Sequence, residues 1–218
     1  MPTNVWTAHT SAGLWQSDPG TGYSHVLSFS SFADLPTALA AQRITNIARL
    51  AIVAHGDSPG VVLVGPPLTS ATVSTFAASL RLLAARLEPA AKVIFFACIA
   101  GRGPEGTTLL THLSRQLPGR RLIGFEVWGE YTDTLPNAPG VITACSAPTP
   151  DMHCFPTARH GRLSPWGQFS KWVVDGVVVR YPILEQNGRP SLRCANLVCR
   201  GHASPADQCS RWHPACEW

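Results

Sequence analysis

Continuous apolar runs recur along the first 130 residues, and short polar turns end them. Three of these runs are typical of strands buried on both faces of a sheet: residues 49–54 (RLAIVA), 92–97 (KVIFFA) and 121–128 (RLIGFEVW). A shorter run at 24–29 (SHVLSF) predicts a further strand. The pattern indicates a sheet built mainly from the first two thirds of the chain.

Segments with helical spacing of apolar residues lie between these predicted strands. They cover residues 31–47, 70–87 and 109–117, and Pro118-Gly119 closes the third. Alternating strands and helices favour parallel pairing with right-handed crossovers. We therefore expect an α/β fold of the three-layer sandwich type, with a mostly parallel central sheet and helices on both faces.

Weaker patterns set the expected boundaries of the domain. Residues 61–64 predict a short strand in a small hairpin, and residues 169–181 predict a hairpin that turns at Asp175-Gly176. The expected organisation is an irregular leader at 1–23, one α/β domain at 24–185 and an irregular tail rich in Cys and His at 186–218.

Composition narrows the class of protein. With 218 residues, 45% of them hydrophobic, the chain is long enough for one compact domain with an appendage. A net charge of +4 without a Lys/Arg run does not favour nucleic acid as a partner. The amino terminus lacks a signal-peptide pattern, and no apolar run approaches 18 residues, so we expect a cytoplasmic protein that does not enter membranes.

The cysteine count points to reduced thiols. Seven cysteines is an odd number, whereas small secreted proteins held together by disulfides are usually shorter and have paired counts. One or more thiols that do chemistry or bind a metal fit this count better.

Two reactive side chains directly follow two of the predicted strands, at the point where the chain leaves the predicted sheet. His55 follows the run 49–54, and Cys98 follows the run 92–97. A nearby imidazole favours the thiolate of a cysteine, which is the nucleophile, and the backbone N–H groups of Gly56 and Cys98 could face a developing oxyanion. Taken singly, such a cysteine is more often a small buried hydrophobe, and a His-Gly pair is more often a turn. The other histidines, His9 among them, have no such spacing and are expected to be surface or locally hydrogen-bonded residues.

The two segments together resemble a known family. AIVAHGDSPGVV followed by FFACIAGRGPEGTTLL is similar to the caspase-like cysteine peptidases, and most of all to bacterial caspase-like, CHAT and toxin self-processing domains. The resemblance covers about residues 45–130. It implies that His55 acts as base and acid, that Cys98 attacks the carbonyl carbon, and that Gly56 helps to form the oxyanion hole.

Substrate preference depends on the residues beside Cys98 and at the neighbouring strand ends. Caspases carry Gln-Ala-Cys where this chain has Phe96-Ala97-Cys98, so the resemblance does not imply their preference for aspartate. Asp57 and Glu126 are expected near the strand ends, and an acidic pocket formed by them would favour a basic residue before the cleaved bond.

The tail is a second candidate site. Six thiolate and imidazole ligands of the kinds that Zn²⁺ prefers occur within 186–218: Cys194, Cys199, Cys209, Cys216, His202 and His213. Their spacing is looser than that of a usual zinc knuckle. A structural zinc, paired disulfides and an unliganded tail therefore stay open.

Two functions follow from these patterns. The first is a cysteine endopeptidase that hydrolyses a peptide bond in a protein substrate or in itself, with no cofactor needed for catalysis. The alternative is a non-catalytic caspase-like adaptor whose zinc-stabilised tail engages a partner protein. A nucleic-acid contact through the mildly basic tail is a weaker third idea.

Overall fold

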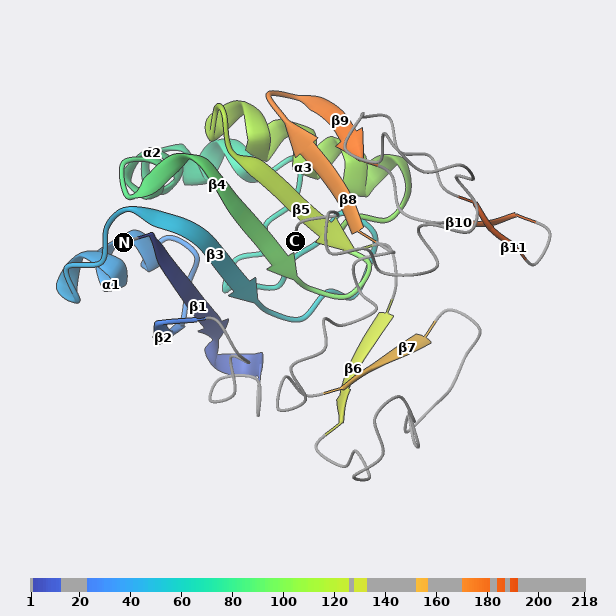
Figure 1. The fold of residues 1–218 in the computed structure, drawn as a ribbon, viewed down its shortest axis with the longest axis horizontal. Coiled ribbons are helices and arrows are strands. Elements are labelled where there is room, and N and C mark those ends of the chain that lie inside the picture. The colour runs from blue at the N-terminus through green and yellow to red at the C-terminus, as the bar shows by residue number, and fades with distance from the viewer. Residues whose placement is uncertain are drawn as a thin grey trace.

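A seven-stranded sheet forms the centre of the protein (Figure 1). The computed structural model describes residues 2–12, 23–125, 128–132, 152–156, 170–180, 184–186 and 189–191. The strand order in the sheet is β2-β1-β3-β4-β5-β8-β9. Its strands are β1 (Thr3–His9), β2 (His25–Phe29), β3 (Ile47–Val53), β4 (Leu87–Phe96), β5 (Arg121–Phe125), β8 (Ser170–Val174) and β9 (Val177–Arg180).

Most of this sheet is parallel. The pairs β1–β2, β1–β3, β3–β4 and β4–β5 are parallel, whereas β5–β8 and β8–β9 are antiparallel. The prediction of an α/β fold with a mostly parallel central sheet is therefore confirmed. Two further pairs form small sheets of their own: β6 (Trp128–Thr132) with β7 (Met152–Pro156), and β10 (Leu184–Gln186) with β11 (Arg189–Ser191).

The α-helices that the structure describes pack on one face of the sheet. Leu50 and Ile52 of β3 belong to a large core that includes buried residues of α1 (Leu35–Ala41), α2 (Ala77–Ala84) and α3 (Gly103–Gln116). Ala51 and Val53, which point the other way, belong to a smaller cluster on the opposite face. Figure 1 shows the three helices behind the sheet.

This arrangement differs from the predicted helices on both faces. The crossovers β2 to β3, β3 to β4 and β4 to β5 all step in the same direction across the sheet. Right-handed crossovers that step in one direction lie on one face, so α1, α2 and α3 share a layer. Within the part of the chain that the structure describes, no helix covers the second face.

Strand β1 corrects the prediction of an irregular leader at 1–23. It lies inside the sheet between β2 and β3, and Val5 and Ala8 are fully buried. The Thr7 hydroxyl donates a hydrogen bond of 2.7 Å to the Ala51 carbonyl oxygen. The segment was missed because its apolar residues are few and interrupted by polar ones, so its sequence does not show the continuous run of a buried strand.

All three predicted helices exist, and the first two are shorter than expected. The region 31–47 forms only α1, since Arg43 (φ 55°) and Asn46 (φ 53°) take left-handed conformations that end it. The region 70–87 forms a 3-10 turn, η2 (Val73–Phe76), followed by α2. The third prediction is confirmed, with α3 beginning earlier than expected, at Gly103.

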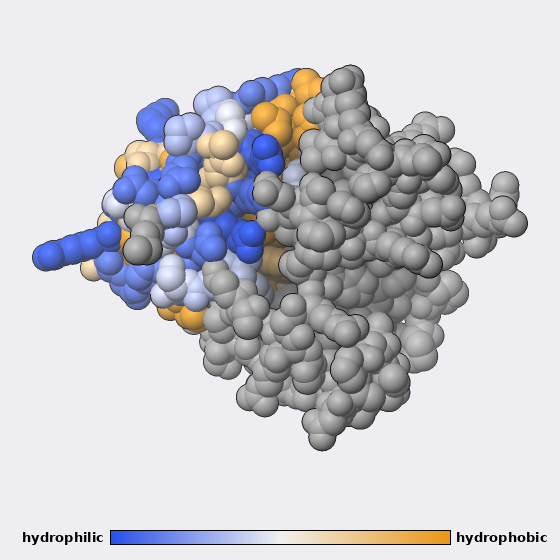
Figure 2. Space-filling view, viewed as in Figure 1, coloured by the Kyte–Doolittle hydropathy of each residue, from blue (hydrophilic) through white to orange (hydrophobic). Residues whose placement is uncertain are grey.

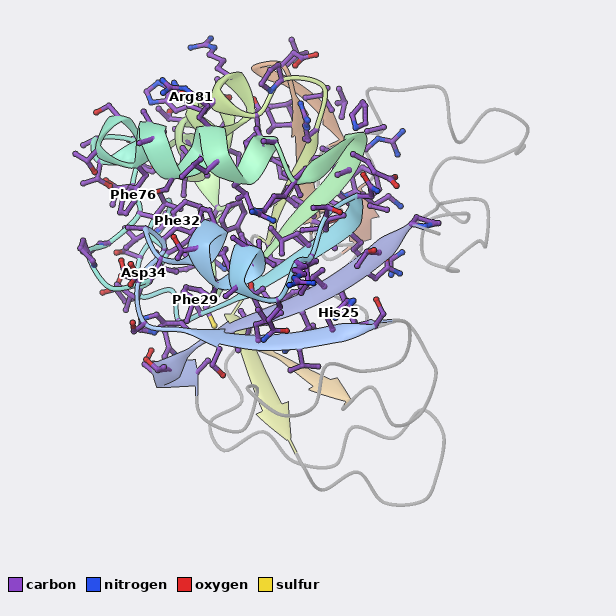
Figure 3. The ribbon with its side chains drawn as sticks, turned by 90° about the vertical axis from the view of Figure 1, so that its left-hand side faces the viewer. His25, Phe29, Phe32, Asp34, Phe76 and Arg81 are labelled. Carbon is purple, nitrogen blue, oxygen red and sulfur yellow. The ribbon has the colours of Figure 1, made fainter. Side chains whose placement is uncertain are left out.

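Aromatic contacts join these elements on the helix side. The rings of Phe32, which follows β2, and Phe76, which ends η2, meet edge to face with their centroids 5.5 Å apart. Figure 3 shows both rings next to each other beside α1 and α2. The contact ties the segment before α1 to the start of α2.

The predicted hairpin at 169–181 is confirmed as β8 and β9. Asp175 (φ 48°) and Gly176 (φ 80°) form the two-residue turn, with the positive φ values that such hairpins need. Figure 2 shows hydrophobic side chains gathered near this hairpin, where Val177 is exposed.

Among the described residues, no helix is long and apolar enough to cross a membrane.

Candidate active site

His55 and Cys98 leave adjacent parallel strands at matched positions. In the register of β3 and β4, Val53 pairs with Phe96, and each reactive residue follows two positions later. The Ala54 N–H donates to the Phe96 carbonyl oxygen over 3.1 Å, which carries the pairing one residue past β3. The two residues therefore emerge side by side at the carboxyl edge of the sheet, as the sequence predicts.

Gly56 and Cys98 touch through their backbones. A Cβ atom added to Gly56 would lie 2.1 Å from the carbonyl oxygen of Cys98 and 3.1 Å from its backbone nitrogen. Real Cβ atoms do not approach backbone oxygen so closely, hence glycine is required here. The absence of a side chain lets the turn after β3 lie directly against the turn after β4.

The His55 ring is held by a carbonyl group on a third segment. Its Nε2 lies 2.9 Å from the carbonyl oxygen of Ser11, which follows β1. A carbonyl oxygen only accepts, so Nε2 carries the proton and, in the neutral ring, Nδ1 keeps its lone pair. The exposed imidazole is thus in the tautomer that can take a proton through Nδ1.

A short hairpin supports the backbone of His55. The carbonyl oxygen of His55 accepts a 2.8 Å hydrogen bond from the Leu63 N–H, and Val62 pairs with Leu68 through two further backbone bonds. The predicted strand at 61–64 is present in this reduced form, as isolated bridges. This pairing fixes the position of the His55 backbone, and with it the position of the imidazole, at the edge of the sheet.

The turn that carries Ser11 is itself fixed by His9. The Nδ1 atom of His9 accepts from the Ser11 N–H over 3.2 Å and lies 2.6 Å from the Ser11 hydroxyl oxygen. The Nε2 atom of His9 lies 3.0 Å from the Ser30 carbonyl oxygen, so it is the donor of that pair. His9 is a locally hydrogen-bonded residue, as expected, and it joins the ends of β1 and β2.

Sequence reasoning missed Ser11. The atom that contacts His55 is a backbone carbonyl oxygen, which every residue type has, and Ser11 lies in the segment predicted to be an irregular leader. Only the pairing of β1 beside β3, with Ala8 opposite Val53, brings the two together.

Cys98 is a half-buried thiol at the start of a constrained turn. The next residue, Ile99, has φ of 46°, which is rare for a β-branched residue. Further along, the Gly101 N–H donates to the Phe125 carbonyl oxygen of β5 over 2.8 Å. A Cβ atom on Gly101 would meet the Gly124 backbone at 2.8 Å. The turn therefore lies closely against the end of β5.

Of the two specificity candidates, the structure describes Asp57. Its carboxylate is exposed and accepts a 2.8 Å hydrogen bond from the Ser58 hydroxyl. The loop it belongs to rests on the first turn of α3, because a Cβ atom on Gly60 would lie 2.7 Å from the Glu105 backbone. Glu126 lies outside the described residues.

Lys171 is a second residue that the sequence did not reveal. It lies on β8, is 3% exposed, and its Nζ atom contacts oxygen atoms of Gly101, Gly103 and Thr107. These residues belong to the turn after Cys98 and to the start of α3.

The structure does not describe the candidate zinc ligands. All six of them, Cys194, Cys199, Cys209, Cys216, His202 and His213, fall outside the described residues. In the described ranges, no group of three or more His, Cys, Asp or Glu side chains gathers closely enough to hold a metal ion. The zinc site stays a prediction.

The fold and the site define an α/β protein with a His and a Cys at neighbouring ends of parallel strands. Residues 26–121 match the model of a family described as "Domain of unknown function (DUF4347)". The match begins in β2 and ends at the start of β5, so it includes both His55 and Cys98. No curated protein and no solved structure was found to match the chain.

Proposed function

We propose that the protein is a cysteine endopeptidase in which His55 and Cys98 form a catalytic dyad. The observation that carries this proposal is the register of β3 and β4, which brings the two residues to equivalent positions on adjacent strands. The contact of Gly56 with the Cys98 backbone and the Ser11 carbonyl oxygen at His55 Nε2 add support. So does the resemblance of both segments to caspase-like peptidases.

The first half of the proposed reaction forms an acyl-enzyme. The Nδ1 atom of His55 takes the proton of the Cys98 thiol, and the sulfur attacks the carbonyl carbon of the scissile amide. The backbone N–H groups of Gly56 and Cys98 stabilise the oxyanion that develops. The C–N bond then breaks, and the His55 imidazolium gives its proton to the departing amine.

The second half releases the acid product. His55 takes a proton from water, the hydroxide adds to the thioester carbonyl carbon, and the C–S bond breaks with return of the proton to sulfur. General acid–base catalysis of this kind contributes about 10²- to 10⁴-fold in rate. In this scheme the Ser11 carbonyl oxygen, 2.9 Å from Nε2, stabilises the imidazolium in each half and leaves Nδ1 as the atom that exchanges the proton.

Several further features of the proposal follow from the sequence. Asp57 and Glu126 would favour a basic residue before the cleaved bond, in a protein substrate or in the chain itself. The dyad needs no cofactor, and zinc held by the tail would be structural. We place the activity in the cytoplasm.

The experiment is a comparison of full-length chains that differ in one cysteine. Cys98→Ala is expected to abolish self-cleavage and the cleavage of a peptide library, since the variant lacks the sulfur that forms the proposed acyl-enzyme. The matched control is Cys154→Ala on β7, outside the main sheet. Cleavage retained by a folded Cys98→Ala variant would contradict the assignment. Wild-type protein without cleavage and with an inert Cys98 thiol would favour the adaptor alternative.

A further inference from the structure

Lys171 is a buried lysine beneath the turn that follows Cys98. It is 3% exposed and lies on β8, between β5 and β9. Its Nζ atom donates to the Gly101 carbonyl oxygen at 2.8 Å, to the Gly103 carbonyl oxygen at 3.2 Å and to the Thr107 hydroxyl oxygen at 2.8 Å. Lysine is almost never fully buried unless its ammonium group is well paired, so a specific structural demand accounts for it here.

The three acceptors enclose the turn between β4 and α3. Gly101 belongs to the turn that begins at Cys98, Gly103 is the first residue of α3, and Thr107 lies one helical turn further on. The Thr107 hydroxyl in turn donates to the Gly103 carbonyl oxygen over 2.8 Å. Removal of the Lys171 amine would leave the buried Gly101 carbonyl group without this donor, whereas the part-buried Gly103 carbonyl group would keep the Thr107 hydroxyl.

The backbone of the turn after Cys98 is strained. Ile99 has φ of 46°, a region that costs an L-residue roughly 1–2 kcal/mol and is worse for a β-branched side chain. Such strain persists only where the surroundings over-determine the backbone. Both backbone polar groups of Gly101 are hydrogen-bonded. Its N–H donates to the Phe125 carbonyl oxygen, and its carbonyl oxygen accepts from Lys171.

We propose that Lys171 is a positioning residue for Cys98. By binding the Gly101 and Gly103 carbonyl oxygens, it holds the turn in the strained conformation that presents the thiol at the sheet edge. A thiol displaced from this position would lie farther from the His55 imidazole, which favours the thiolate in the proposed dyad. This role rests on the proposed function, because it matters only where Cys98 reacts.

The test measures the rate at which iodoacetamide alkylates Cys98 in the full chain. Mass spectrometry of the peptide that contains Cys98 separates it from the other six cysteines. The variants are Lys171→Met, Lys171→Gln and Thr107→Val, each compared from about pH 5 to pH 10 with thermal unfolding alongside. The matched control is Lys92→Met. Lys92 is another lysine of the same sheet, on β4, but its Nζ atom lies over the Trp172 ring, 5.8 Å from the ring centroid.

We expect Lys171→Met to slow alkylation near neutral pH about tenfold and to move the midpoint of the rate profile to higher pH. Lys171→Gln is expected to react faster than Lys171→Met, because its amide can donate to the same carbonyl groups. Thr107→Val, which removes one acceptor and is a small change, is expected to slow the reaction by a smaller factor. Lys92→Met is expected to behave like wild type.

The outcomes separate this role from the proposed function. A wild-type Cys98 that reacts no faster than the same thiol in the denatured chain would contradict the dyad itself. A reactive wild-type Cys98 whose rate and pH midpoint are unchanged in Lys171→Met and Thr107→Val would overturn the positioning role alone. If Lys171→Met does not fold, Lys171→Gln and Thr107→Val decide.

Discussion

At the scale of single residues, Gly56 lies so close to the Cys98 backbone that no side chain fits at its position. An alanine Cβ atom at this position would lie 2.1 Å from the Cys98 carbonyl oxygen, and backbone cannot move aside as a flexible side chain can. We expect Gly56→Ala to cost about 1–3 kcal/mol of unfolding free energy or more, and to slow alkylation of Cys98. Chemical denaturation and labelling of the folded variant measure the two effects.

Gly124→Ala is the control for that substitution. Its added Cβ atom would meet the methyl groups of Leu110 at 3.1 and 3.3 Å, and these can shift by a few tenths of an ångström. It is expected to be milder in both measurements. Equal losses in the two variants would show that Gly56 has no special place beside Cys98.

The sequence predicts the two residues of the proposed dyad but not those that hold them. His55 and Cys98 each follow a long apolar run, and such runs predict strands whose carboxyl ends share one edge of a parallel sheet. Ser11 acts through a backbone carbonyl oxygen, and Lys171 lies 70 residues from its partner Gly101. Neither contact has a local sequence signature, since each depends on strand order.

At the scale of elements, the turn after β1 positions the imidazole. The His9 ring accepts from the Ser11 N–H and contacts the Ser30 carbonyl oxygen, which fixes the turn whose carbonyl oxygen binds His55. A hydrogen bond of this kind contributes about 1 kcal/mol, equivalent to about fivefold in rate. We expect His9→Phe, which removes all three polar contacts of the ring with Ser11 and Ser30, to slow the proposed peptide cleavage about fivefold or more.

The matched control is His25→Phe. His25, which Figure 3 labels, begins β2 at the amino edge of the sheet. His9 ends β1 at the carboxyl edge. The control variant is expected to cleave at the wild-type rate. An unchanged rate in His9→Phe as well would mean that the Ser11 turn holds its place without the His9 ring.

Helices and strands with a clear hydrophobic or turn pattern are predicted better than those that depend on pairing with distant segments. Strands β3, β4 and β5 form at the three apolar runs, and Asp175-Gly176 marks the β8–β9 hairpin. However, β4 begins earlier than its run, at Leu87, and β5 ends at Phe125, before the predicted end at residue 128. Strand β1 has no such run, and the helix predicted at 31–47 ends early because Arg43 and Asn46 turn the chain toward β3. Both misses reflect tertiary pairing, which no local window of sequence contains.

At the scale of the whole molecule, the site depends on the order of strands. The carboxyl ends of β1, β3, β4 and β5 supply Ser11, His55, Cys98 and the Phe125 carbonyl oxygen, and β8 supplies Lys171. Strand β1 must insert between β2 and β3 for Ser11 to reach His55. The one-directional crossovers also explain why the described helices share one face, which the alternation of strands and helices alone did not specify.

Because the site forms only in the folded chain, the reactivity of Cys98 reports on the dyad directly. The most direct measurement is the alkylation rate of Cys98 near neutral pH in wild type and in His55→Gln, with the denatured chain as reference. We expect wild-type Cys98 to react faster than in the denatured chain, and His55→Gln to lower that rate about tenfold or more, since the thiolate loses its base. Equal rates in the two folded proteins would contradict the dyad.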